Sequence, residues 1–450
     1  MTVLRRAFAC MVLAALCFVG AGLPPAAAKM FSPETFTLAN GLQVVVVANH
    51  RAPVVTHMVW IKAGSADEVA GKTGIAHFLE HLMFRGTTEV GAGRFSEIVS
   101  RLGGDENAFT TSDYTAYYES VAAESLARMM QLDADRLQNL DLTDATVLPE
   151  RDVILEERRQ RIDNDPSAQL GEMLNAALYL NAPYRTPVIG WEHEMAGLVT
   201  ADARGFYDRW YAPNNVIVVI AGDVTLASVQ PLAEKYYGAI PVRAVPARER
   251  VAEPLQFAPR RVTLESAQVR QASWIRAYQA PSYHTAGAEH AYALQVLAQI
   301  LGGDTTSRLY RRLVVEQKLA VGASADYGAN RLGISAFSLS ATPPAGGKLD
   351  QLEAAMDKEV AGLLATGVTQ DEVARAVASL QAAAIKAADS LAGPARIIGG
   401  ALASGATIED VEAWPDRIGQ VTVDQVNAAA KAVFDINRSA TGRLLPKETS

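Results

Sequence analysis

Cysteine is almost missing from this sequence. The chain of 450 residues has only two, Cys10 and Cys17, and both lie near the N-terminus. If that segment is removed during export, the mature chain has no cysteine to form a disulfide, bind a metal or act as a nucleophile. Catalysis would then depend on a metal ion, carboxylates, histidines or hydroxyl groups.

An excess of positive charge is missing as well. The sequence has 41 Lys and Arg against 49 Asp and Glu, a formal net charge of -8. Nucleic-acid-binding proteins usually present a clustered basic surface, so we expect no nucleic-acid partner. With 49% hydrophobic and 20% charged residues, the chain has a globular composition, and its length allows two to four domains.

Residues 1–28 have the pattern of a secretory signal peptide. Arg5 and Arg6 precede an apolar run over residues 7–23, and three alanines follow before the predicted cleavage site. The run is short for a membrane-spanning helix, which argues against a stable anchor. We therefore predict a periplasmic or secreted protein. The arginine pair weakly resembles a twin-arginine signal, but the strongly apolar run favours general secretion.

The rest of the chain is predicted to form two similar α+β halves, residues 29–240 and 260–450. Residues 241–259 contain four prolines and no periodic pattern, and are predicted to be a linker. Each half shows strands, a helix, a Gly-Gly break, further strands and long helices, ending in an apolar strand. In the first half these are three strands in 36–64, helices at 74–84 and 94–102, paired strands in 107–121, helices from 124 to about 211 and a strand at 216–221. In the second half they are strands in 261–278, helices at 286–301 and 307–316, strands in 321–340, long helices and a strand at 439–445. We expect a mostly antiparallel sheet packed with helices in each half.

The stretch HFLEH, residues 77–81, is a candidate metal site. On a helix, His77 and His81 lie one turn apart on the same face and can bind one ion. Glu80 is placed to take a proton from a metal-activated water. The order is the reverse of the familiar HExxH pattern. The alternative is a pair of structural histidines on a packed helix, so the motif needs a third ligand.

The third ligand is predicted in ERDVILEERRQRI, residues 150–162. On a helical wheel, Val153 and Ile154 mark the buried arc, and Glu150 and Glu157 both fall near its centre. Glu156 falls at the edge of the arc. Carboxylates on an apolar face are costly unless they are paired or bound to a metal. We predict Glu157 as the ligand and Glu150 as an accessory carboxylate; the alternative is a solvated charged helix.

At this point the sequence resembles the inverzincin zinc metallopeptidases, the family of pitrilysin, insulin-degrading enzyme and the mitochondrial processing peptidase. The stretches that carry the resemblance follow in order along nearly the whole mature chain: GIAHFLEHLMFRGT, LGGDENAFTTSDYTAYY, ERDVILEE, YAPNNVIVVIAGDV and LGGDTTSRLYRRL. The match is best with the short, two-domain bacterial type. It implies a zinc endopeptidase with one Zn2+ per chain, bound by His77, His81 and Glu157.

The resemblance also implies how a substrate binds. Family members add their peptide as a strand on a sheet edge, and Asn107, Ala108, Phe109 and Thr110 occupy the matching positions here. A polar strand flanked by turns is a fair template for such an addition, although an ordinary strand is an equal alternative.

One part of the family's machinery is absent. Active members usually carry an arginine and a tyrosine seven residues apart in the second domain or in a partner, and the matching positions here are Val314 and Val321. The resemblance therefore implies a heterodimer whose partner subunit supplies the pair; a homodimer is less favoured. Two other readings stay open, a non-catalytic subunit derived from a peptidase and a protein that only holds metal. The presence of all four zinc-site residues argues against a non-catalytic subunit. Glu80 argues against a protein that only holds metal.

Overall fold

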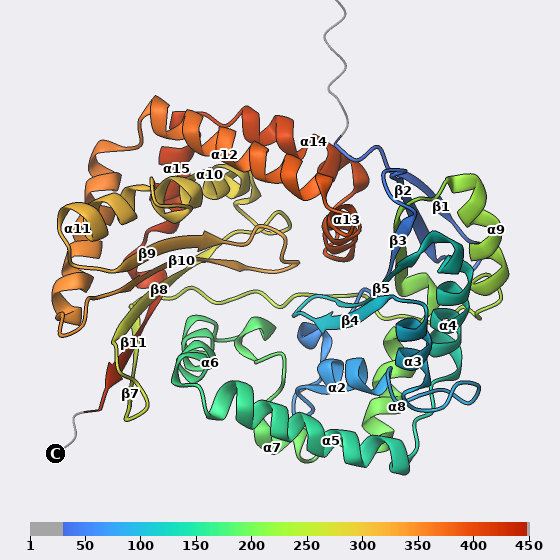
Figure 1. Cartoon of the computed structure of the whole chain (residues 1–450). Coiled ribbons are helices and arrows are strands. Elements are labelled where there is room, and N and C mark those ends of the chain that lie inside the picture. Colours follow the sequence, from blue (N-terminus) through green and yellow to red (C-terminus); the bar gives the residue numbers. More distant parts are fainter. Residues whose placement is uncertain (1–29, 448–450) are drawn as a thin grey trace, which may run out of the picture. The chain divides into compact units, whose positions relative to one another are not determined.

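The computed structural model of the chain describes residues 30–447 (Figure 1). The predicted signal peptide, residues 1–28, lies outside the described residues. Within the described part, none of the helices combines the length and the apolar character needed to cross a bilayer.

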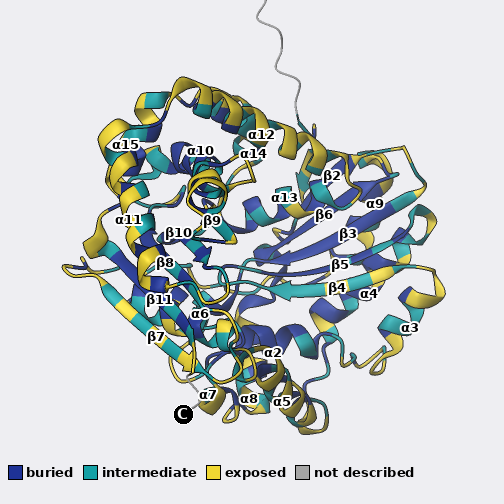
Figure 2. Cartoon of the chain, turned by 60° about the vertical axis from the view of Figure 1, so that its left-hand side comes forward, coloured by how far each residue is buried: buried dark blue, intermediate teal, exposed yellow. Residues whose placement is uncertain are grey.

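The first half builds a six-stranded sheet. Its strands are β1 (Glu34–Thr37), β2 (Gln43–Ala48), β3 (Val54–Ile61), β4 (Asp105–Thr110), β5 (Thr115–Ala122) and β6 (Val216–Gly222). They lie in the order β1-β2-β6-β3-β5-β4, and all neighbours are antiparallel except β2 and β6. The burial pattern follows the apolar runs of the sequence, because β6 is buried throughout and β3 is buried over all but its first residue (Figure 2). Strand β4 forms one edge of this sheet.

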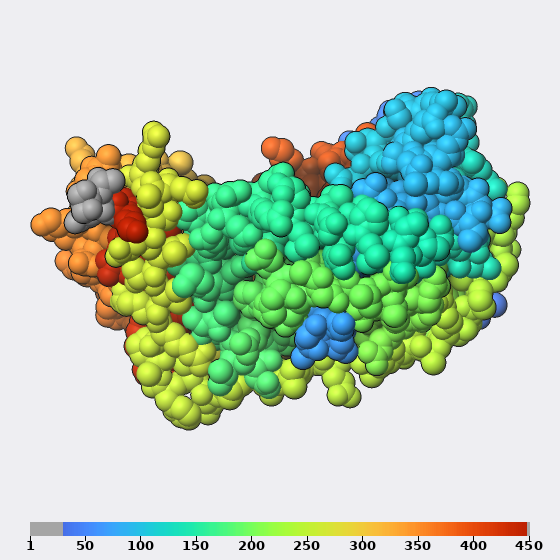
Figure 3. Space-filling model, turned by 90° about the horizontal axis from the view of Figure 1, so that it is seen from below, coloured from blue at the N-terminus to red at the C-terminus, as the bar shows by residue number. Residues whose placement is uncertain are grey.

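The first half also contains helices. They are α2 (Ile75–Leu82), α3 (Arg94–Arg101), α4 (Leu126–Asn139), α5 (Asp144–Arg158), α6 (Pro166–Leu178), α7 (Glu192–Met195), α8 (Thr200–Trp210) and α9 (Leu226–Tyr236). Helix α2 packs against β4 on one side and against α5 and α8 on the other. The surface seen in Figure 3 is formed largely by the segment from α5 to α8, in teal and green. The helical stretch predicted to continue to residue 211 is interrupted between α6 and α7, where Pro183 and Pro187 cannot donate helical hydrogen bonds.

The second half repeats this plan. Strands β7 (Arg260–Ser266), β8 (Ser273–Ala280), β9 (Gly322–Tyr327), β10 (Ser335–Thr342) and β11 (Ser439–Pro446) lie in the order β7-β11-β8-β10-β9, with β7 and β11 parallel. The first sheet has the same order from β2 onwards: first strand, last strand, second, fourth, third. The predicted fold class, two similar halves with mostly antiparallel sheets, is therefore confirmed.

The helices of the second half are α10 (Ala291–Gly302), α11 (Leu349–Thr366), α12 (Gln370–Asp389), α13 (Gly393–Ala403), α14 (Ile408–Gly419) and α15 (Val423–Val433). The helix predicted at residues 307–316 is present, mainly as a wider π-helical segment, Tyr310–Glu316.

One helix of each half packs against the sheet of the other half. Helix α6 packs against β7 and β11, while α13 packs against β3 and β6 (Figure 1). The α13 contact is close because Gly399 has no side chain: a Cβ there would lie 2.1 Å from the ring of Trp60. Each half has its own core, and a smaller cluster joins the halves, with Leu174 and Leu178 of α6 packed against Ala277 and Ala440 of the second sheet.

The segment 241–259 has neither helix nor strand, but it is firmly tied to the first half. Arg250 pairs with Asp67 at 2.7 Å and with Asp113 at 2.8 Å, and all three side chains are buried. The Asp113 carboxylate also accepts a hydrogen bond from the backbone N–H of Leu332 in the second half. The segment predicted from its composition to be a linker is thus an ordered connection, held in place by these buried ion pairs.

Candidate metal centre

Helix α2 places the two histidines of HFLEH. Its apolar side chains Ile75, Phe78, Leu79 and Leu82 are at most 3% exposed and pack into the core of the first half. The helix begins after Gly74, whose φ of 88° is the left-handed conformation that glycine adopts readily. His77 and His81 then stand on one face with ring centroids 4.7 Å apart.

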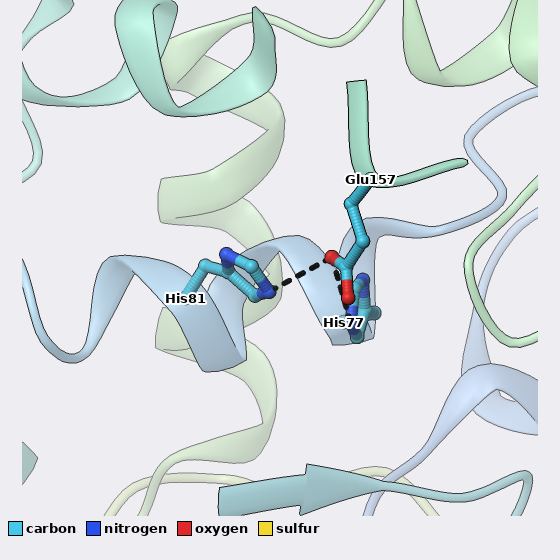
Figure 4. A group of neighbouring side chains, drawn as sticks. All are labelled: His77, His81 and Glu157. Atoms are coloured by element: carbon cyan, nitrogen blue, oxygen red, sulfur yellow. Dashed lines mark ion pairs between the residues drawn. The ribbon is translucent and has the colours of Figure 1, made fainter. Parts of the chain in front are cut away.

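Glu157 of α5 reaches the same point. Its Oε2 lies 3.3 Å from Nε2 of His81 and 3.7 Å from Nε2 of His77 (Figure 4). Two ligand atoms of a tetrahedral zinc site are separated by about 3.4 Å, since each bond is about 2.0–2.1 Å. The buried Oε2 of Glu157 has no hydrogen-bond partner, so it is available to an ion. The three residues predicted as ligands are brought together in a geometry and a chemistry that fit zinc.

The two imidazoles differ in their protonation. Burial, reinforced by the neighbouring His81, lowers the pKa of His77 to about 4, which leaves this ring neutral. Burial also opposes a charge on His81, but the hydrogen bond with Glu150 and the negative charge of Glu157 outweigh it and raise the pKa of His81 to about 9. A metal ion at this site must therefore displace a proton from His81.

Glu80 faces the same space from α2. Its side chain is buried, and its Oε2 accepts a hydrogen bond from Thr110 Oγ1 at 2.5 Å. Burial raises the pKa of Glu80, although the Thr110 hydroxyl works against this. A carboxylate with a raised pKa that is fixed beside three potential ligands is suited to accept and return a proton.

Glu150 lies behind His81. Its Oε1 accepts a hydrogen bond from Nδ1 of His81 at 2.9 Å, and its Oε2 pairs with Nε of Arg85. Burial would raise the pKa of Glu150, but the hydrogen bonds with His81 and Arg85 dominate and lower it. An ionised Glu150 holds the His81 proton on Nδ1 and leaves Nε2 facing the candidate metal position.

Two arginines complete the surroundings and were not predicted. Arg85 pairs with Glu150, and Arg161 pairs with Oε1 of Glu157 at 2.8 Å. Each follows a predicted ligand, His81 or Glu157, by four residues in the sequence. That helical spacing was the only signal that could have indicated them.

The buried arc predicted for α5 was wrong in one position. Val153 is 47% exposed, whereas Ile154 is fully buried. The buried face runs instead through Val147, Glu150 and Ile154. Val153 therefore lies outside the buried face. Glu157 lies beside α2, with 17% of its side chain exposed.

Residues 107–110 form most of edge strand β4. Ala108 packs against the core of the first half, and Thr110 contacts Glu80, so both lie on the side of α2. Asn107 and Phe109 face the opposite side of the sheet. Thr111 N–H bonds to Tyr114 O at the hairpin end, which fixes the alternation of the ladder. It follows that the backbone groups of Ala108 and Thr110 point towards the open edge; within residues 30–447 no strand pairs there.

The second half offers no arginine–tyrosine pair at the expected positions. Val314 packs beside the core of that half, and Val321 is 53% exposed. Neighbouring candidates are used locally: Arg308 pairs with Glu372 at 2.7 Å, and the Tyr327 hydroxyl donates to a carbonyl oxygen at 2.6 Å.

A second group of potential ligands lies inside the first half, and we call it the buried ionic cluster: His57, Glu119, Asp133 and Arg136. Nδ1 of His57 is 3.2 Å from Glu119 and 3.0 Å from Asp133, and all four side chains are at most 3% exposed. Arg136 pairs with both carboxylates, and Arg136 and a protonated His57 together balance their two negative charges, so the cluster has no need of a metal cation. The place of His57 in the core is that of a structural residue.

The fold and the motif together define a class, the metallopeptidases with two similar halves, and comparison with known proteins gives the family. The family described as insulinase (peptidase family M16) matches residues 43–191, and the peptidase M16 inactive domain matches residues 198–380. The zinc protease PqqE of Helicobacter pylori is 34% identical over 64% of this chain and 65% of its own length. A protein of Mycobacterium tuberculosis named as a zinc protease is 32% identical over 90% of this chain and 91% of its own length. The chain belongs to peptidase family M16, and the resemblance predicted from the sequence is confirmed.

Solved structures agree in fold. A protease from Helicobacter pylori superposes with a TM-score of 0.87 at 29% identity, covering 92% of this chain and 99% of that chain. Pitrilysin superposes with a TM-score of 0.76 at 17% identity, which shows the fold alone, and the match covers 93% of this chain but 45% of pitrilysin. This chain thus has the fold of about half of a pitrilysin chain.

Proposed function

We propose that this chain is a zinc-dependent endopeptidase that hydrolyses peptides or unfolded polypeptides. The observation that carries the proposal is the convergence of His77, His81 and Glu157, with ligand atoms 3.3 and 3.7 Å apart, beside the buried carboxylate of Glu80. A site built only to hold metal would not need Glu80.

The residues have separate roles in this proposal. His77, His81 and Glu157 hold one zinc ion, which supplies Lewis-acid chemistry and a water nucleophile near neutral pH. Glu80 accepts the proton of the attacking water and delivers it to the leaving amine. Glu150 positions His81 through Nδ1 and does not touch the reacting atoms.

The substrate would lie along β4. The outward-pointing backbone groups of Ala108 and Thr110 offer hydrogen bonds to an added strand, and Thr110 joins this edge to Glu80. A peptide bound in this way passes the predicted metal position with its backbone extended. Asn107 and Phe109 would contact its alternate side chains.

A partner subunit completes the proposal. Val314 and Val321 can neither donate side-chain hydrogen bonds nor carry charge where active relatives are expected to have an arginine and a tyrosine. The structural likeness to pitrilysin, which covers only 45% of that longer chain, is consistent with a working unit of two such chains. We infer a heterodimer with a related subunit, exported through the predicted signal peptide.

The experiment compares the wild-type mature chain, Glu80→Gln and Glu156→Gln, a control on the exposed side of α5. All three should bind one zinc per chain, measured by metal analysis after dialysis. The wild type and the control should cleave an unfolded fluorogenic peptide slowly, and Glu80→Gln at least about 100-fold more slowly. Equal rates for wild type and Glu80→Gln would contradict the peptidase. Rapid cleavage by the lone wild-type chain would contradict only the need for a partner.

A further inference from the structure

Helix α13 belongs to the second half but packs against the first sheet, and it places the positive charge of Arg396 near edge strand β4. The guanidinium of Arg396 lies 4.5 Å from the ring centroid of Tyr118 on β5 and 5.6 Å from that of Phe109 on β4. Arg396 is solvent-exposed. The side chains named here lie on the face of the sheet opposite α2 and the candidate metal centre.

The side chains of Trp60, Phe109 and Tyr114 pack together beside Arg396, and we call them the aromatic platform. Trp60 packs edge-on against Phe109 at 5.7 Å and against Tyr114 at 5.2 Å between ring centroids. Because Trp60 pairs with Ala116 and Ala116 with Phe109, these residues form one row across the sheet. The close contact of Gly399 with Trp60 fixes α13 over this row, and Arg396 lies one turn before Gly399.

An added strand would continue this row. Directly opposed residues on neighbouring strands point to the same face, and neighbouring strands lie about 4.8 Å apart. The peptide residue opposite Phe109 would therefore project its side chain next to the aromatic platform, within reach of the Arg396 guanidinium. Its neighbours in the peptide would point to the other face, towards Glu80.

The charge on this face changes sign along β4. Asp105, four residues before Phe109 and on the same face, is exposed. An acidic side chain is attracted where Arg396 stands and is repelled near Asp105. The discrimination is therefore confined to the part of the peptide opposite Asn107 and Phe109.

We propose that Arg396 is a specificity-determining residue that selects an acidic side chain in the peptide strand bound at β4. The inference rests on the proposed function, because it assumes that the peptide adds to this edge. It narrows the substrate class to peptides with an aspartate or glutamate at one position, within a few residues of the scissile bond. The side chains that carry the preference come from opposite halves of the chain.

The test measures peptide binding in the zinc-loaded Glu80→Gln protein, which holds substrate without cleaving it. In a series of fluorescent peptides, one glutamate is moved along a neutral sequence, with matching glutamine and lysine series. At one position, or at two positions two residues apart, glutamate should bind about three- to fivefold more tightly than glutamine, and lysine more weakly. Adding Arg396→Gln should abolish the preference, Arg396→Glu should reverse it, and Arg396→Lys should keep it.

The control is Arg209→Gln, which removes an exposed arginine on α8 and should leave the preference unchanged. If glutamate, glutamine and lysine bind equally at every position, or if Arg396→Glu keeps the original preference, the inference is wrong and the peptidase proposal stands. If no peptide binds to the zinc-loaded protein, β4 is not the substrate edge and the inference falls with it. Loss of cleavage in Glu80→Gln tests the peptidase separately, so the two failures are distinguishable.

Discussion

Replacing Glu150 by glutamine tests whether this buried carboxylate positions a metal ligand. Glu150 is 3% exposed and receives hydrogen bonds from two donors, Nδ1 of His81 and Nε of Arg85. An amide of the same shape has one oxygen and one NH2 group. In either orientation, one of the two N–H donors would therefore face another donor, and the negative charge that raises the basicity of His81 would be lost.

The magnitude follows from these two contacts. Losing one hydrogen bond to a buried charged group costs about 1.5–3 kcal/mol. Removing the partner of a metal-binding histidine typically lowers metal affinity about 10- to 100-fold, which is about 1.4–2.7 kcal/mol. Both routes give the same range, so we expect the zinc dissociation constant of Glu150→Gln to rise by one to two orders of magnitude.

The assay is a competition titration of zinc against a chromogenic chelator. Glu156→Gln is the matched control, because Glu156 lies on the same helix with 54% of its side chain exposed and pairs with Arg159, away from the histidines. Its affinity should equal that of the wild type. A Glu150→Gln protein that folds normally and binds zinc within about threefold of the control would refute the positioning role.

Two further predictions concern the core. Burial opposes a charge on His57, but its hydrogen bonds within the buried ionic cluster dominate and raise its pKa to about 9. The stabilisation is thus complete below pH 6.5, the ordinary histidine pKa, and is lost as the pH rises through about 9. Denaturant unfolding should show that the free energy of unfolding falls by at most about 3 kcal/mol between pH 7 and pH 9.5. This fall should disappear in His57→Gln and persist in His193→Gln, a control at an exposed histidine. Equal pH dependence in the two variants would contradict the prediction. The second prediction is that Gly399→Ala lowers the unfolding free energy by about 1–3 kcal/mol, because the added Cβ would collide with Trp60. The control Gly362→Ala, with open space around it, should be neutral or slightly stabilising. Equal effects of the two changes in thermal unfolding would refute the close contact.

Local sequence patterns predicted the elements that carry the candidate site. The apolar spacing around HFLEH predicted helix α2, and the period of residues 150–162 predicted that Glu150 and Glu157 lie on related faces of one helix. Such patterns are reliable because a helix or strand must bury one face, whatever it packs against. The error at Val153 arose because the prediction took both apolar residues of one short segment as buried, whereas a single valine can stay exposed on a helix.

The sequence by itself determined the α+β class, the repeated order of elements and the placement of His77 and His81 on one helix face, since each depends on contacts between residues near in sequence. Only the tertiary structure decided which groups meet across long separations. Arg85 joins Glu150, Thr110 joins Glu80, and Arg396 joins Phe109, from segments between 30 and 287 residues apart. The exchange of α6 and α13 between the halves is of the same kind. Long-range pairings are set by how whole faces pack, and local patterns of charge or polarity carry no record of them.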